Sequence, residues 1–99
     1  MNANLSFENR QVLNLIQALL GRISSNFRVI GLSLIGASVS LYFIIQQEDL
    51  ADRSDIEDIV FEFEALQVEG VDVDVWVFVD DRPLADLEMP KRVVFIRKE

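Results

Sequence analysis

The sequence predicts an α+β fold in which two helices accompany a four-stranded, mostly antiparallel sheet. Two kinds of periodicity predict it. Apolar residues recur at helical spacing near the N-terminus and again around residue 60, whereas apolar and polar residues alternate strictly from 71 to 79. A chain of 99 residues is long enough for one domain, residues 1–99, with one modest core. The expected order along the chain is α-β-β-α-β-β.

The first helix is expected from about Phe7 to Leu20. Counted from Val12, apolar side chains stand at i, i+1, i+4, i+7 and i+8, which places them on one stripe. Asn4 and Ser6 are candidate N-caps, because their side chains can accept hydrogen bonds from the first free amides. Gly21 follows as a residue suited to the left-handed conformation that ends many helices.

A β-hairpin is expected next, with strands at Phe27–Ile35 and Val39–Gln46 joined by a turn at Gly36. The stretch Val29–Ile45 has no charged residue and reaches about the lower length limit of a membrane-spanning helix. Three serines and two glycines dilute this stretch, and its apolar positions alternate after Gly36. A hairpin is therefore favoured over a membrane segment.

The second helix carries a buried stripe between residues 56 and 66. Asp49 or Asp52 can cap it, and Ser54 with Glu57 has the spacing of a capping box. Acidic residues crowd its first turns, where the helix dipole favours them. The stripe consists of Ile56, Ile59, Val60, Phe63 and Leu66. Phe61 is expected to point outward among acidic side chains.

The third strand is expected at Val71–Val79 and the fourth at Arg92–Arg97, with a loop from Asp80 to about Pro90 between them. The third strand has five valines on one side. Its other side carries Asp72, Asp74, Trp76 and Phe78. If both helices pack on one face of the sheet, the valines face the helices and the aspartate and aromatic side chains face outward.

The net charge of −8 is unevenly distributed. From Glu48 to Asp81 there are thirteen acidic residues and one base, Arg53, which gives this segment a charge of −12, and the rest of the chain carries +4. A field of this sign repels nucleic acid and attracts basic proteins. The same charge also keeps a protein soluble, so it does not by itself identify a partner.

The composition excludes several kinds of site. The chain has no cysteine and no histidine, so the usual nucleophile–base pairs and the common zinc sites are absent. No phosphate-binding glycine loop and no nucleophile elbow is present. No secretory signal pattern is seen at the N-terminus. We therefore expect no enzyme, no cofactor and no membrane anchor.

Asp72 and Asp74 are the one arrangement that resembles a catalytic site. Two carboxylates at i and i+2 of a strand point the same way and can hold a divalent metal ion, as in a metal-dependent hydrolase. Metal binding that is lost in Asp74→Asn would favour this alternative. The same alternation of acidic residues and valine is also typical of an exposed strand, where the charges keep the strand soluble.

Two surfaces are candidate partner-binding sites. The first is the outward side of the sheet, where large apolar side chains would serve as interface anchors unless a helix or the 84–89 loop covers them. The same face could pair with itself in a homodimer. The second is the acidic surface of the second helix, whose alternative is an ordinary solvated face. The residues expected to contact a partner are Tyr42, Asp55, Asp58, Phe61, Glu62, Asp72, Asp74, Trp76 and Phe78.

Three segments of the chain together have a familiar pattern: residues 14–28, residues 52–67, and residues 80–84 with 92–99. They resemble small acidic bacterial immunity proteins of contact-dependent growth inhibition and related polymorphic toxin systems. The resemblance implies a cytoplasmic inhibitor that binds a cognate toxin domain, often a nuclease with a basic cleft. It marks no contact residues, and the 29–45 hairpin has fewer charges than the family pattern.

Overall fold

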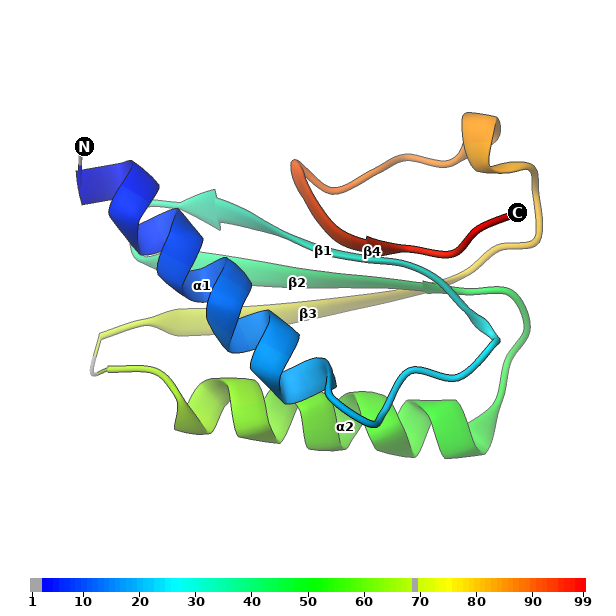
Figure 1. The fold of residues 1–99 in the computed structure, drawn as a ribbon, viewed down its shortest axis with the longest axis horizontal. Coiled ribbons are helices and arrows are strands. Elements are labelled where there is room, and N and C mark those ends of the chain that lie inside the picture. The colour runs from blue at the N-terminus through cyan, green and yellow to red at the C-terminus, as the bar shows by residue number, and fades with distance from the viewer. Residues whose placement is uncertain (1–2, 69) are drawn as a thin grey trace.

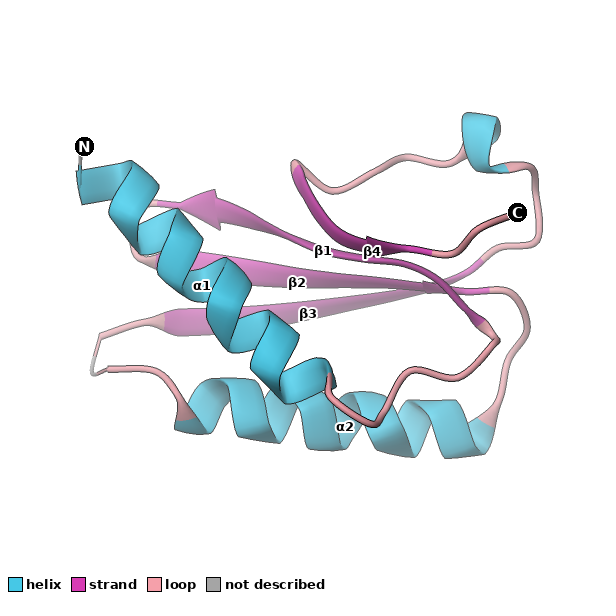
Figure 2. Cartoon of the chain, viewed as in Figure 1, coloured by secondary structure: helices cyan, strands magenta, loops and turns pink. Residues whose placement is uncertain are grey.

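The computed structural model describes residues 3–68 and 70–99. Along the chain it contains α1 (Ala3–Leu19), β1 (Phe27–Ile35), β2 (Ser38–Ile45), α2 (Leu50–Ala65), β3 (Asp72–Val79), the short 3-10 helix η1 (Leu84–Asp86) and β4 (Arg92–Ile96). The predicted α+β class and the order α-β-β-α-β-β are confirmed (Figures 1 and 2).

The strands form one sheet in the order β3-β2-β1-β4. β1 is antiparallel to both β2 and β4, but β2 and β3 are parallel. The sheet is therefore mixed, and the expectation of a mostly antiparallel sheet did not anticipate this parallel pair. The reason lies in the connection: α2 crosses over between two neighbouring strands, so the chain re-enters the sheet at the end where β2 began. The last strand then pairs on the far side of β1.

Both helices pack on one face of the sheet and enclose the main core. Figure 1 shows α1 crossing the strands diagonally and α2 running along β3. The buried side chains that form the core are Leu15, Ala18 and Leu19 of α1, Ile56, Ile59 and Phe63 of α2, and Phe27, Ile30, Leu32, Val39, Leu41, Phe43 and Ile45 of the central strands. Val73 and Val77 of β3 pack against it, whereas Val75 and Val79 are exposed. The predicted valine side therefore faces the helices but is only partly covered.

Of the predicted caps, Asp49 is confirmed for α2, whereas the two candidates for α1 do not stand at its start. α1 starts at Ala3, so Asn4 and Ser6 lie inside the helix, and the prediction that one of them caps it was wrong. α2 is capped by Asp49, whose Oδ1 accepts a hydrogen bond from the Asp52 amide at 3.0 Å. The proposed capping box at Ser54 therefore lies within the helix. Asp49 precedes it by more than one turn, and its carboxylate already satisfies an amide of the first turn.

The uncharged stretch 29–45 forms the hairpin of the two central strands, as predicted. The turn between them contains Gly36 at φ +59°, a conformation that glycine adopts without strain. These central strands are covered by both helices on one face and in part by the 84–89 loop on the other, which accounts for the missing charges. Among the described residues, no helix is long and apolar enough to cross a membrane.

Candidate interaction surface

The outer face of the sheet is half covered. The loop between β3 and β4 folds over this face, and Leu87 with Leu84 packs against Val29 and Ile44. Ile44 is only 4% exposed, so on this half of the face the 84–89 loop covers the outer side, which is the alternative that the sequence left open. The other half of the face is more open, since Trp76 is 50% exposed and Phe78 is 45% exposed. Phe78 and Tyr42 also line a pocket together with residues 86–91 of the loop.

Three aromatic side chains form the open half of this face, which we call the aromatic platform: Tyr42, Trp76 and Phe78. The parallel register places Tyr42 opposite Trp76 and Ile44 opposite Phe78, so Tyr42 lies between the two β3 aromatics. Its ring centroid is 6.5 Å from that of Trp76 and 6.4 Å from that of Phe78, with interplanar angles of 14° and 8°. Each ring restrains its neighbour, so the platform presents ordered apolar surface at low entropic cost.

Asp72 and Asp74 continue the same side of β3 beyond Trp76. Both are exposed, and within the described residues neither forms an ion pair or a side-chain hydrogen bond. The described residues contain no group of three or more acidic, cysteine or histidine side chains placed to hold a metal ion. Two free carboxylates beside an aromatic platform suit recognition of a cation, since an aromatic face and a carboxylate both attract positive charge.

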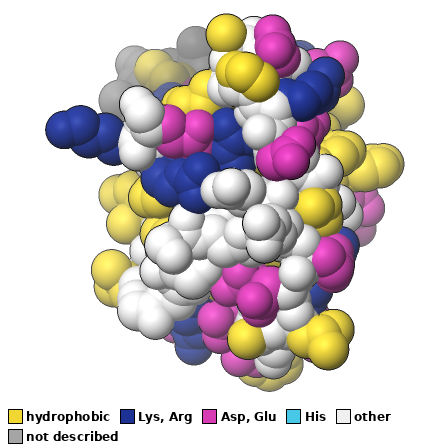
Figure 3. All heavy atoms as spheres, turned by 90° about the vertical axis from the view of Figure 1, so that its right-hand side faces the viewer, with side chains coloured by type: hydrophobic (Ala, Val, Ile, Leu, Met, Phe, Trp, Pro, Cys, Tyr) yellow, Lys and Arg dark blue, Asp and Glu magenta, His cyan; other side chains and the backbone are white. Residues whose placement is uncertain are grey.

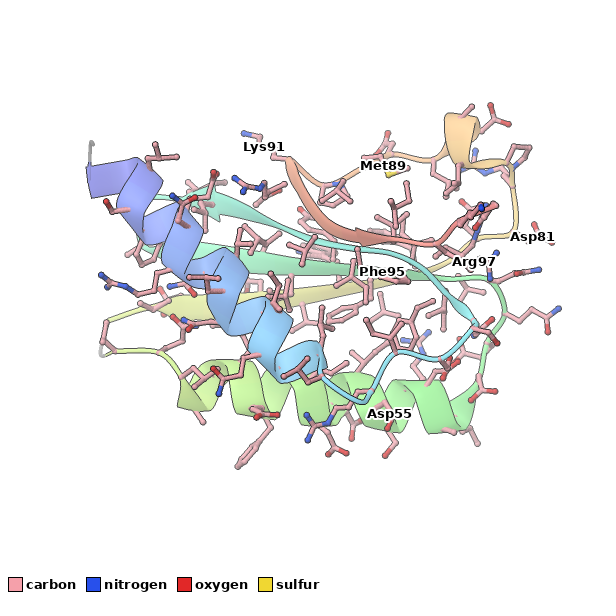
Figure 4. All side chains as sticks on the ribbon, viewed as in Figure 1. Asp55, Asp81, Met89, Lys91, Phe95 and Arg97 are labelled. Carbon is pink, nitrogen blue, oxygen red and sulfur yellow. The ribbon has the colours of Figure 1, made fainter. Side chains whose placement is uncertain are left out.

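The predicted α2 surface is divided between two sides of the helix. Phe61 points outward as predicted and is 77% exposed. Glu62 instead forms an ion pair with Arg22, which lies in the turn that follows α1. Asp55 is half-buried and Asp58 is exposed. Figure 4 shows Asp55 on α2, at the opposite side of the molecule from Met89 and Lys91. These residues therefore do not form one surface with the outer-face loop.

A groove of about 410 Å³ lies between α2 and β3, and we call it the edge groove. Its apolar lining consists of Ile56, Val60, Phe61, Val75 and Val77, and its polar rim consists of Arg53, Glu57 and Glu64. The Arg53 guanidinium is held by Glu48 through two hydrogen bonds of 2.8 Å. Sequence patterns did not identify Glu57, Glu64 and Val75 as candidate site residues. Helical spacing groups the two glutamates with Phe61, but only the strand order shows that this side of α2 meets an edge strand.

Among the described residues, ion pairing leaves some acidic side chains engaged and others unpaired, and four of the unpaired ones lie at this edge. Six arginines are engaged by carboxylates: Arg22, Arg28, Arg53, Arg82, Arg92 and Arg97. Around β3 and the edge groove, by contrast, Glu57, Glu64, Asp72 and Asp74 have no ion-pair partner among the described residues. In Figure 3, acidic side chains gather low on the face where α2 begins, and others lie among the basic side chains in its upper part.

Two carboxylates are held by structural ion pairs instead of being free for binding. Hydrogen bonds from the Arg82 side chain and backbone lower the pKa of Asp80 to about 2. Hydrogen bonds from Arg28, and next from Arg97, lower the pKa of Glu99 to about 2. Both carboxylates are ionised at neutral pH and organise the loop after β3. The candidate surface therefore consists of the aromatic platform with Asp72 and Asp74 and the edge groove with Glu57 and Glu64.

Comparison with protein families places most of this chain in a known family. Residues 8–99 match a family described as MafI2 immunity protein. Comparison with curated proteins finds no match. The family match covers all the strands, all of α2 and most of α1, and it confirms the resemblance to immunity proteins of bacterial polymorphic toxin systems.

Proposed function

The chain belongs to the MafI2 immunity protein family, and on this premise we propose that it binds one cognate toxin domain in the cytoplasm and holds it inactive. The observation that carries the proposal is the family match over residues 8–99. A protein that acts by binding needs a stable contact surface and no reacting groups. This agrees with a sequence that has neither cysteine nor histidine.

We propose that the toxin is basic, with a nuclease as the best candidate. A nuclease must hold a polyanionic substrate, so its cleft carries lysine and arginine side chains. A chain of net charge −8, whose unpaired carboxylates lie beside β3, presents the complementary charge. Complementary fields of this kind accelerate association and lose strength as salt is added.

The contact surface in this proposal is centred on the aromatic platform. Trp and Tyr are frequent anchors of protein interfaces, and half-exposed rings ordered against one another lose little freedom on binding. Asp72 and Asp74 lie next to the platform on the same side of β3 and supply the charge. The covered half of the outer face, under Leu87, is expected to contribute less.

The test is a protection and capture experiment with the toxin domain encoded by the neighbouring gene. Coexpression of the chain should restore growth of cells that make this toxin. Capture of the toxin by the tagged chain should weaken as salt is raised. Failure to capture or to protect against that toxin would contradict the proposal.

Two matched double variants test which acidic residues contribute to association with the toxin. Asp72→Asn with Asp74→Asn removes two charges beside the platform. Asp86→Asn with Glu88→Gln removes two from the exposed outer-face loop. We expect the first pair to slow association and flatten its salt dependence more than the second. Equal effects from both pairs would indicate that only the overall charge matters.

A further inference from the structure

β3 leaves one edge of the sheet open. It is the outermost strand, and its eight residues pair with β2 in a register without a shift. The other outer strand, β4, is only five residues long, follows Pro90, and has a register shift against β1. Short length, proline and irregular pairing are the usual devices that keep an edge from accepting another strand. β4 is short, pairs irregularly and directly follows a segment that contains a proline, whereas β3 has none of these features and carries only the charges of Asp72 and Asp74.

The backbone direction along β3 follows from one hydrogen bond. The Asp80 amide donates to the carbonyl oxygen of Ile45 on β2, at 2.9 Å. In a strand, the amide and carbonyl groups of one residue point to the same edge, and those of the next residue point to the other edge. The backbone amide and carbonyl groups of the even-numbered residues of β3 therefore point toward β2. The amides of Val73, Val75 and Val77 face the open edge, where they are available to another strand.

Side-chain surfaces suited to a new strand lie on both sides of this edge. Trp76 and Phe78 of the aromatic platform stand on the outer side, and Val75 and Val77 line the edge groove on the helix side. A strand added beside β3 would alternate its side chains between these two surfaces. The groove accepts apolar side chains, whereas the outer side, with Trp76 next to Asp74, favours arginine or lysine.

The charges around the open edge of β3 indicate which kind of strand can pair there. Four unpaired acids, Glu57, Glu64, Asp72 and Asp74, lie along the edge, and Arg53, the base at the groove, is already paired with Glu48. A second copy of this chain would bring the same four acids and a net charge of −8 against them. Like charges at close range disfavour that pairing, whereas a strand with basic residues is attracted.

We propose that β3 receives a strand of the toxin by edge-to-edge addition, and that this strand alternates apolar with basic side chains. The inference rests on the proposed function, since it assigns how the toxin is bound. Backbone hydrogen bonds would supply affinity along the edge, and the groove and the platform would supply specificity.

The first test replaces one outward-facing amide. Val75→Pro removes the donor and places a ring at the edge without breaking a bond to β2, and proline is tolerated at such positions. Val75→Ala is the matched control, because it also loses the valine side chain but keeps the amide. With the neighbouring-gene toxin domain as probe, Val75→Pro should bind at least about tenfold more weakly than Val75→Ala, as expected for one or two lost hydrogen bonds. Equal affinities of the two folded variants would overturn the proposal.

A second measurement uses the unaltered chain and does not depend on how the proline variant folds. NMR-detected hydrogen exchange should show the amides of Val73, Val75 and Val77 exchanging fast in the free chain and becoming protected in the toxin complex. A complex that leaves these amides unprotected would overturn strand addition while leaving the proposed function intact. A wild-type chain that forms no toxin complex would overturn both. A dimer of the free chain that Val75→Pro abolishes would assign the edge to a second copy and also overturn the proposal.

Discussion

The guanidinium group of Arg28 forms a two-bonded ion pair with the carboxylate of Glu99. The distances are 2.8 Å from Nε to Oε2 and 2.6 Å from Nη2 to Oε1. Arg28 is 2% exposed, and its Nη1 also donates to the carbonyl oxygens of Asp80 and Arg82. A buried guanidinium is tolerated only when its donors are satisfied in this way. This one side chain of β1 therefore connects the segments that follow both edge strands, β3 and β4.

The Arg28–Glu99 pair predicts acid sensitivity. The pKa of Glu99 is lowered to about 2 by the hydrogen bonds from Arg28 and Arg97. Because this pKa lies below its unfolded value of about 4.3, the pair stabilises the fold fully above that value, and the contribution is lost as the pH falls toward about 2. The melting temperature should therefore drop across this range.

Glu99→Gln provides the control for the acid prediction. It should lower the melting temperature at neutral pH by about 5 °C or more, and should make the acid-induced drop shallower. Some acid dependence should remain, because Asp80, paired with Arg82, also has a pKa of about 2. Differential scanning calorimetry over this pH range measures both effects. An unchanged acid profile in the variant would contradict the assignment.

Gly31→Ala should destabilise the fold by about 1–3 kcal/mol, the usual cost of forcing extra volume into a packed site. A Cβ at residue 31 would overlap the carbonyl oxygen of Arg92 and Cγ of Pro90. Urea unfolding monitored by Trp76 fluorescence measures the change. Ser40→Ala, on the neighbouring strand, should stay near wild type. Wild-type stability of Gly31→Ala would show that β4 approaches β1 less closely than described.

The side-chain amides of Gln11 and Gln67 donate to each other, both at 2.8 Å, and link α1 to the end of α2. Gln11 is buried, so Gln11→Leu should cost about 1–3 kcal/mol by leaving one partner unsatisfied. The double variant with Gln67→Leu should recover part of this loss, because both polar groups are then removed together. A urea-unfolding double-mutant cycle measures the coupling, and additive losses would argue against a paired interaction.

Trp76→Ala should weaken toxin binding by at least about 1 kcal/mol if this ring is an interface anchor. Its half-exposed position means that the fold should be little affected. Titration calorimetry with the toxin domain measures the affinity. Leu13→Ala removes another exposed apolar side chain, on α1, and should bind like wild type. Unchanged affinity of a folded Trp76→Ala chain would remove this residue from the contact surface.

Local patterns predicted the bounds of one strand and the buried stripe of α2, but in α1 three residues of the expected stripe, Leu13, Ile16 and Leu20, are exposed. The strand at Phe27–Ile35 has the predicted bounds, and the stripe of α2 is buried at Ile56, Ile59 and Phe63. The helix starts were predicted less well. Several polar residues in a row can cap, and the choice between them is decided elsewhere: the Asp52 carboxylate accepts hydrogen bonds from Ser24 and Asn26 and so is not available as a cap.

The candidate surface could be predicted only in part. Alternation along β3 correctly indicated that Trp76 and Phe78 share an outward side with Asp72 and Asp74. It could not show that the 84–89 loop would bury Ile44, nor that Glu62 would turn to Arg22. Those outcomes depend on contacts between residues far apart in the chain, and the periodicity within one segment does not reveal such contacts.

The sequence by itself determined the α+β class, the order of helices and strands, the acidic balance and the two-sided character of β3, because each follows from periodicity and composition. Only the tertiary structure decided that β3 lies parallel to β2 at an open edge, that α2 forms a groove beside it, and that four of the unpaired acids lie there. Strand order and ion pairing are settled by packing between distant segments, where burying the common core selects one arrangement among several that the local patterns allow.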